Sequence, residues 1–151
     1  METNEKLVGT LNEVVRINND RQDGYQLAAR ETDDVTLKKL FSQFASDSAK
    51  FRDDLIVEVT KLGGAAAHDS TVQGKVYRAW MEVKKAVTGG DAHAIIASCE
   101  FGEDAALKAY DDALKSDEVT SNVRELLHKQ RLIIREAHDR IKQMRDSTVK
   151  S

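Results

Sequence analysis

Two acidic residues, Glu100 and Glu103, interrupt an apolar helical stripe in the stretch ASCEFGEDAAL. At helical spacing they fall between Ile96 and Leu107, on the side of the helix that would otherwise be buried. A buried carboxylate needs a partner, because without one it takes up a proton or the fold loses stability. The sequence therefore predicts either a carboxylate metal site or an internal polar cluster at this position.

The metal interpretation takes Glu100 and Glu103 as ligands and Asp20, Asp23 and His138 as further candidates, with iron or manganese as the cofactor. A di-iron bundle uses a Glu from each of two helices and a Glu-x-x-His from each of the other two. Here both glutamates fall on one predicted helix, and no Glu stands three residues before His138. His138 is also expected about 7 Å along the axis from the level of Glu100, at 1.5 Å per residue. The di-iron set is incomplete, and a mononuclear site stays open.

The other interpretation is a structural polar layer across the middle of a helical bundle. Each predicted long helix carries a polar residue near the midpoint of its apolar stripe. Counting back from the connecting loops places Glu103 level with Gln130, and Asn18 close to the level of Ser48. Arg21 is the expected cation of this layer, and the amides and the hydroxyl can supply hydrogen bonds.

The elements that would position these residues are amphipathic helices, since apolar residues recur at spacings of three and four along most of the chain. The long helices are predicted at 4–30, 34–62, 91–115 and 118–146, with a shorter one at roughly 72–88. Short links within the first and last pairs predict two antiparallel hairpins, joined by a long crossover that contains the short helix. The expected fold class is all-α, a ferritin-like four-helix bundle. An up-down-up-down bundle with a capping helix is the competing topology.

The composition supports one helical domain over residues 1–151. The chain is 40% hydrophobic and 32% charged and contains no proline, a mixture that favours long solvated helices. Its net charge of −3 makes no electrostatic case for nucleic acid. No apolar run approaches the roughly 20 residues of a membrane span, and no signal peptide is visible. With Cys99 as the one cysteine, a reducing, cytoplasmic location is expected.

A homodimer is left open by apolar positions on the first predicted helix. Val8, Val15 and Ile17 lie beside its main stripe and hint at an exposed face. No other protein partner can be named from the sequence.

Several segments stand out beyond the helical pattern: Asp20–Tyr25, Gly63-Gly64, Trp80-Met81, Thr88–Asp91, Cys99–Tyr110 and Glu136–Ile141. Together they resemble a bacterial family of small ferritin-like four-helix-bundle proteins of uncharacterised function, over nearly the whole chain. The resemblance implies a ferritin-like bundle and no particular activity. Ferritin's di-iron ligands do not carry over, since only Glu100 or Glu103 has a counterpart. Related ferritin-like families are linked to stress responses, so a stress association is a further expectation.

Two function classes follow from the sequence. The first, which we favour, is a non-enzymatic bundle that acts through its surface or as a dimer, because no complete catalytic constellation is present. The second is a carboxylate metal-binding protein that uses the Glu100 and Glu103 pair. The two classes differ in whether these carboxylates face each other across an ion-sized gap or are bound by side chains such as Arg21.

Overall fold

The computed structural model describes residues 2–71, 74–89 and 91–150 of the chain. Within these residues it contains five α-helices and no strand, which confirms the all-α prediction. The helices are α1 (Glu2–Glu31), α2 (Val35–Lys61), α3 (Gly74–Gly89), α4 (Ala92–Leu114) and α5 (Ser121–Lys150). The expected start of the short helix at residue 72 and the expected turn residue Gly90 lie outside the described residues. In the described part of the chain, no helix is long and apolar enough to cross a bilayer.

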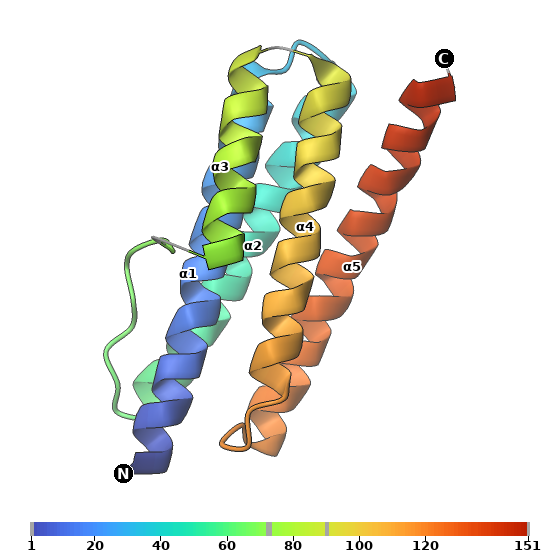
Figure 1. Ribbon diagram of the computed structural model, residues 1–151. Coiled ribbons are helices and arrows are strands. Elements are labelled where there is room, and N and C mark those ends of the chain that lie inside the picture. Colours follow the sequence, from blue (N-terminus) through green and yellow to red (C-terminus); the bar gives the residue numbers. More distant parts are fainter. Residues whose placement is uncertain (1, 72–73, 90, 151) are drawn as a thin grey trace.

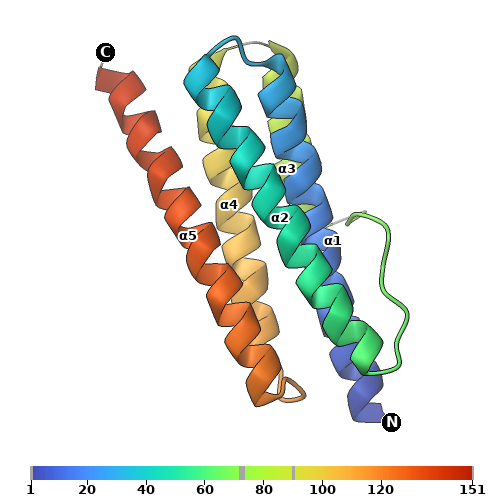
Figure 2. The same cartoon turned by 180° about the vertical axis from the view of Figure 1, so that it is seen from behind.

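The helices form two antiparallel hairpins, α1 with α2 and α4 with α5 (Figure 1). After α2 the chain turns back along α1, so α3 begins about halfway along the bundle and ends near the α1–α2 turn (Figure 1). α3 lies against α1 and α4, on the side away from α2 and α5 (Figures 1 and 2). As a result α2 and α4 run in one direction while α1 and α5 run in the other.

Aspartate side chains cap the starts of α2 and α4, and a glycine follows the end of α2. Asp34 caps α2 by accepting a hydrogen bond from the Leu37 backbone N–H at 3.0 Å. Asp91 caps α4 in the same way through the His93 N–H, at 3.0 Å. After α2, Gly63 has a φ of 78°, a left-handed conformation that glycine adopts without strain.

The start of the last helix differs from the prediction. α5 begins at Ser121 rather than at 118. The preceding loop is held by tertiary contacts, because the Thr10 hydroxyl donates to Oε1 of Glu118 at 3.0 Å and Val119 is buried. Ser116 and Asp117 are residue types that favour the start of a helix, but here the loop continues past this capping signal. The hairpin loop is therefore longer than expected, and this shifts the register of α5 against α4.

The apolar core is divided into two clusters along the bundle axis. Near the α4–α5 loop, buried residues come from Leu7–Ile17, Phe51–Val59, Ala106–Leu114 and Val119–Ile134. Near the α1–α2 turn, they come from Tyr25–Ala29, Leu37–Ala45, Trp80–Val87, Ile95–Cys99 and Ala137–Ile141. Buried polar side chains lie at the level between the two clusters.

The crossover is fastened to α1 by polar side chains one helical turn apart. Asn12 donates to the Ala65 carbonyl at 2.9 Å, and Arg16 donates to Asp69 at 2.8 Å. One turn further along α1, the Asp20 carboxylate accepts a hydrogen bond from Thr71. These contacts fix the path of the chain between α2 and α3.

The apolar positions on α1 that were expected to be exposed are not exposed at Val15 and Ile17. Val15 is 0% exposed and Ile17 is 2% exposed, and Val8 packs against the same core. A side chain at Gly64, just after α2, would clash with Val8, which shows how closely the chain leaving α2 approaches this face. The extra apolar positions on α1 are therefore buried within the chain itself.

Asp20 provides a test of the contacts between the crossover and α1. Burial raises the pKa of the Asp20 carboxyl, although hydrogen bonds from Thr71 oppose this shift. The folded chain therefore binds this proton more tightly than the unfolded chain does. The stability gained from binding this proton is present below the ordinary pKa of 3.8. It is lost as the pH rises through the raised pKa of Asp20 in the folded chain.

We expect Asp20→Asn, which stays neutral and keeps an acceptor for Thr71, to stabilise the protein at pH 7. The effect should be on the order of 1 kcal/mol, the usual scale of one polar substitution. Urea unfolding of both proteins from pH 3 to pH 7 would measure it. The difference should shrink as the pH falls, and a constant difference would show that ionisation of Asp20 is not its cause.

Trp80 packs α3 against α1 and α4. Its side chain is 1% exposed and its ring lies 5.2 Å from that of Tyr25, edge to face. Gly24 on α1 and Gly102 on α4 make room for the indole, since a Cβ at either position would lie within 3 Å of it. Trp80 is therefore a core packing residue and not an exposed interface anchor.

Candidate functional site

A buried ion pair lies at the centre of the bundle. Arg21 and Glu103 have side chains that are 0% exposed, and they form two parallel hydrogen bonds, Nε to Oε1 and Nη2 to Oε2, each of 2.7 Å. The remaining guanidinium nitrogen donates to the Ser48 hydroxyl at 2.8 Å and to the Phe44 carbonyl at 3.3 Å. Burial alone would lower the pKa of Arg21, but the Glu103 carboxylate raises it, so the guanidinium is held in its charged form.

A second chain of hydrogen bonds joins the same helices and α5. Asn18 donates to the Tyr110 hydroxyl at 2.8 Å, and this hydroxyl donates to Oε1 of Gln130 at 2.8 Å. The Gln130 amide then donates to the Phe51 carbonyl of α2 at 3.2 Å. We call the six side chains of these two networks the central polar layer: Asn18, Arg21, Ser48, Glu103, Tyr110 and Gln130.

The sequence prediction of this layer is confirmed for Asn18, Arg21, Ser48, Glu103 and Gln130, whereas Glu100, also expected there, binds Arg145 outside it. Tyr110 was not predicted as a member, although a tyrosine on a buried stripe is itself a signal, because its hydroxyl needs a partner. Gln130 was expected level with Glu103, and within the layer its hydrogen-bond partner is Tyr110. Because Arg21 engages both carboxylate oxygens of Glu103, this glutamate has an alternative to a metal ion as its partner.

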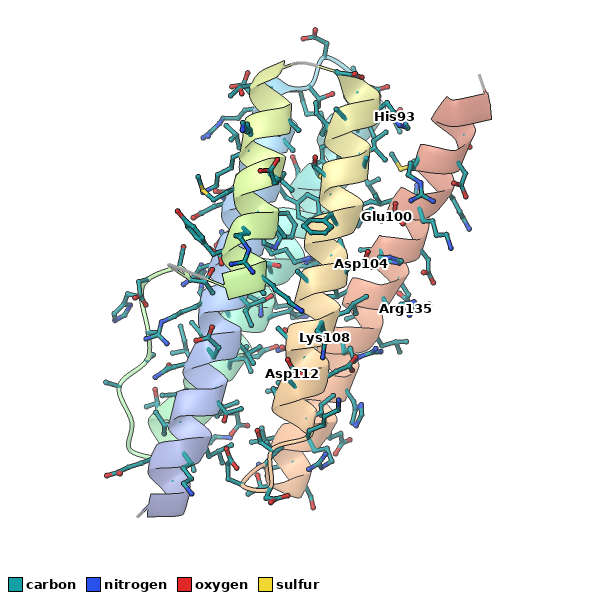
Figure 3. All side chains as sticks on the ribbon, in the orientation of Figure 1. His93, Glu100, Asp104, Lys108, Asp112 and Arg135 are labelled. Carbon is teal, nitrogen blue, oxygen red and sulfur yellow. The ribbon has the colours of Figure 1, made fainter. Side chains whose placement is uncertain are left out.

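A cluster of possible metal ligands lies on a different side of α4, toward α5. Glu100 and Asp104 are one turn apart on α4 and face the same way (Figure 3). His138 of α5 reaches them, with Nε2 at 2.7 Å from Oδ1 of Asp104 and at 4.0 Å from Oε1 of Glu100. One ligand atom from each of the three residues lies within 4.8 Å of the other two. We call these residues the α4–α5 cluster.

The geometry of the α4–α5 cluster is close to that of a metal site. Two ligand atoms bonded to one ion at about 2.1 Å can be no more than about 4.2 Å apart. The two histidine–carboxylate distances, 2.7 and 4.0 Å, satisfy this limit. Glu100 and His138 are each 8% exposed, whereas the Asp104 side chain is 60% exposed. An ion here would be held from the protein side and open to solvent on the other.

The orientation of His138 is fixed by its other ring nitrogen. Nδ1 lies 3.1 Å from Oδ1 of Asp139, and this hydrogen bond is the main cause that lowers the pKa of Asp139. A carboxylate behind the distal nitrogen is the usual support of a metal-binding histidine, because it sets the tautomer and leaves the other nitrogen free to ligate. Nε2 of His138 points into the cluster, toward the Asp104 carboxylate, and is the candidate ligand atom.

The structure brings together two of the residues proposed from sequence as ligands, Glu100 and His138. Glu103 lies apart from them in the central polar layer, Asp20 binds Thr71 of the crossover, and Asp23 is exposed on α1. Asp104 was missed, although its spacing of four residues from Glu100 was a usable signal.

The expected axial offset of His138 from Glu100 overestimated their separation. The loop between α4 and α5 is longer than expected, which brings residues further along α5 level with Glu100. In addition, a helical side chain leans toward the N-terminus of its helix, so His138 reaches back toward α4.

Cys99 neighbours Glu100 in sequence but takes no part in the cluster. It is 0% exposed, and burial, together with the nearby Glu103, raises the pKa of its thiol. The thiol therefore stays protonated, and the interpretation of Cys99 as an unreactive core residue agrees with this environment.

These features define an all-α protein of two helical hairpins, with an ion-paired polar layer inside and a carboxylate–histidine cluster on its surface. The chain belongs to the family described as a domain of unknown function, DUF2383, which matches residues 6–116. The match includes Glu100, Asp104 and the Arg21–Glu103 pair, whereas His138 lies beyond it. A search of curated proteins found no match.

Proposed function

We propose that this chain is a ferritin-like helical bundle that binds one divalent transition-metal ion at the α4–α5 cluster. The observation that carries the proposal is the convergence of three ligand atoms, from Glu100, Asp104 and His138, within 4.8 Å of one another. The hydrogen bond between His138 and Asp139 supports it, because it orients the ligand nitrogen. The ferritin-like assignment is supported by the two antiparallel hairpins and the long connection between α2 and α4 (Figure 1).

The ligand types favour certain metals. One imidazole and two carboxylates suit Mn²⁺, Fe²⁺ and Zn²⁺ better than soft-metal ions, which prefer sulfur. The set differs from a di-iron centre in the bundle interior, where Glu103 is instead bound to Arg21. Three protein ligands and an exposed side leave coordination positions for water or a small anion.

Mn²⁺ and Zn²⁺ titrations, followed by calorimetry, test this function. We expect one ion per chain, and we expect His138→Ala to lower the affinity by at least about tenfold, since even supporting residues of metal sites have effects of 10- to 100-fold. Elemental analysis after loading with Fe²⁺ in the absence of oxygen would extend the test to iron.

His128→Ala is the matched control for this titration. His128 is exposed on the same helix, so its loss removes an imidazole without touching the cluster. Equal losses of affinity in the two variants would assign the binding to surface histidines in general. A wild-type protein that binds neither ion would exclude the proposed site.

A second candidate function, a bundle that acts through its surface without a metal, is favoured by the central polar layer. There the ion pair of Arg21 and Glu103 satisfies the buried charge that first suggested a metal. In this case the same titrations would show no stoichiometric binding, and the search would turn to protein partners.

A further inference from the structure

Arg145 lies two turns beyond His138 on the same face of α5. Its Nη1 donates to Oε2 of Glu100, while the other oxygen of Glu100 faces His138. Glu100 is therefore shared between a proposed metal ligand and a guanidinium. A divalent ion bound through Glu100 would stand within a few ångströms of a second positive charge.

We propose that Arg145 competes with the metal ion for Glu100, so that metal binding displaces Arg145 and releases the end of α5 from the bundle. The inference rests on the proposed function, because it concerns the regulation of the same cluster. The metal ion and the guanidinium are both positive, and like charges repel each other most strongly where water is excluded. Glu100, which would lie between them, is only 8% exposed. A metal ion bound through Glu100 therefore weakens the contact between Glu100 and Arg145, and this contact in turn weakens metal binding.

Arg145 has a route out of the site. Its side chain is 33% exposed, in contrast to the fully buried guanidinium of Arg21. It also donates to the carboxylate of Asp146, at 3.1 Å, on the exposed side of α5. A displaced Arg145 can therefore keep an acidic partner and become hydrated.

The end of α5 depends on this contact more than the rest of the helix does. α5 diverges from α4 and α2 toward its C-terminal end (Figures 1 and 2). A cleft of about 550 Å³ opens there, with Leu37, Ile96 and Met144 among the residues that line it. Of the described side chains from 142 to 147, only Met144 and Arg145 are partly buried. Loss of the contact between Arg145 and Glu100 therefore weakens the attachment of this segment, in which Met144 is the other partly buried side chain among residues 142–147.

The test compares Arg145→Gln with Arg140→Gln in Mn²⁺ titrations. Both variants remove one positive charge from α5, but Arg140 is exposed and lines the neighbouring cleft. We expect Arg145→Gln to raise the affinity for Mn²⁺ about tenfold, within the 5- to 150-fold range usual for coupled sites. Arg140→Gln should leave the affinity within about twofold of the wild type, since removal of a screened surface charge has little effect.

Hydrogen exchange of α5 provides a readout that does not depend on affinity. In the wild type, Mn²⁺ should accelerate amide exchange in residues 142–147, and in Arg145→Gln exchange there should be fast with or without the ion. Exchange near the α4–α5 loop should stay unchanged in every sample.

The outcomes separate the two proposals. Unchanged Mn²⁺ affinity in Arg145→Gln, or an equal rise in both variants, would overturn the competition while leaving the metal site in place. Slower exchange at the end of α5 on addition of Mn²⁺ would overturn the release. Absence of Mn²⁺ binding in the wild type and in Arg145→Gln alike would overturn the metal site, and this inference with it.

Discussion

Replacing Glu103 by glutamine is expected to destabilise the fold by about 3–5 kcal/mol, the usual effect of removing one partner of a buried ion pair. The substitution leaves Arg21 charged and fully buried, with no carboxylate to neutralise it. Arg21 cannot escape by losing its proton, because a guanidinium stays charged throughout the accessible pH range. Urea unfolding at pH 7 measures the effect, and the metal content of the variant should equal that of the wild type.

Asp111→Asn is the matched control for Glu103→Gln. Asp111 also binds an arginine through two hydrogen bonds, of 2.6 and 3.3 Å to Arg131, but their side chains are 41% and 29% exposed. Water can solvate either group after the change, so a cost below about 1 kcal/mol is expected. Similar costs in the two variants would show that burial does not determine the effect.

A double variant separates the ion pair from the surrounding packing. Arg21→Met combined with Glu103→Leu removes both charges and retains apolar volume between the two core clusters. The loss of unfolding free energy in the double variant should be clearly smaller than the sum of the losses in Arg21→Met and Glu103→Leu alone. The reason is that the double variant leaves no buried charge without a partner. Additive costs would indicate that the two side chains contribute through packing alone.

The central polar layer could be predicted because buried polar residues interrupt a regular apolar pattern. Arg21 was identified as the partner of the carboxylates since it follows Asn18 on the first stripe. The sequence could not decide which glutamate Arg21 would bind. Glu100 and Glu103 differ by about 60° around a helix, and only the packing of α4 against its neighbours determines which of them faces the centre.

The α4–α5 cluster was predicted only in part because it depends on the register between two helices. The number of residues in the connecting loop sets this register, and the capping signal at Ser116 misplaced the start of α5. The fold was less sensitive to such errors. Two hairpins and a long crossover follow from the lengths and order of the helices, and a shift of three residues changes neither.

The close approach of α3 to α1 leads to the second large effect, a loss of stability in Gly24→Ala. A Cβ at Gly24 would lie 2.4 Å from Cε3 of Trp80, and this rigid, buried ring can make room only if α3 shifts away from α1. Overpacking of a core usually costs about 1–3 kcal/mol, and the upper end is expected here. Alanine in a helix gains about 1 kcal/mol over glycine, which leaves a net loss of about 2 kcal/mol.

Gly9→Ala on the same helix isolates the clash from the helix propensity. A Cβ at Gly9 meets no atom within 4 Å, so this variant should gain about 1 kcal/mol. The two alanine variants should therefore differ by about 3 kcal/mol in urea unfolding. Trp80 is the only tryptophan, so a red shift of its fluorescence in Gly24→Ala would report that α3 has moved away from α1. A gain of stability in both variants, with unchanged fluorescence, would contradict this prediction. It would mean that a Cβ at Gly24 fits beside Trp80 without a clash.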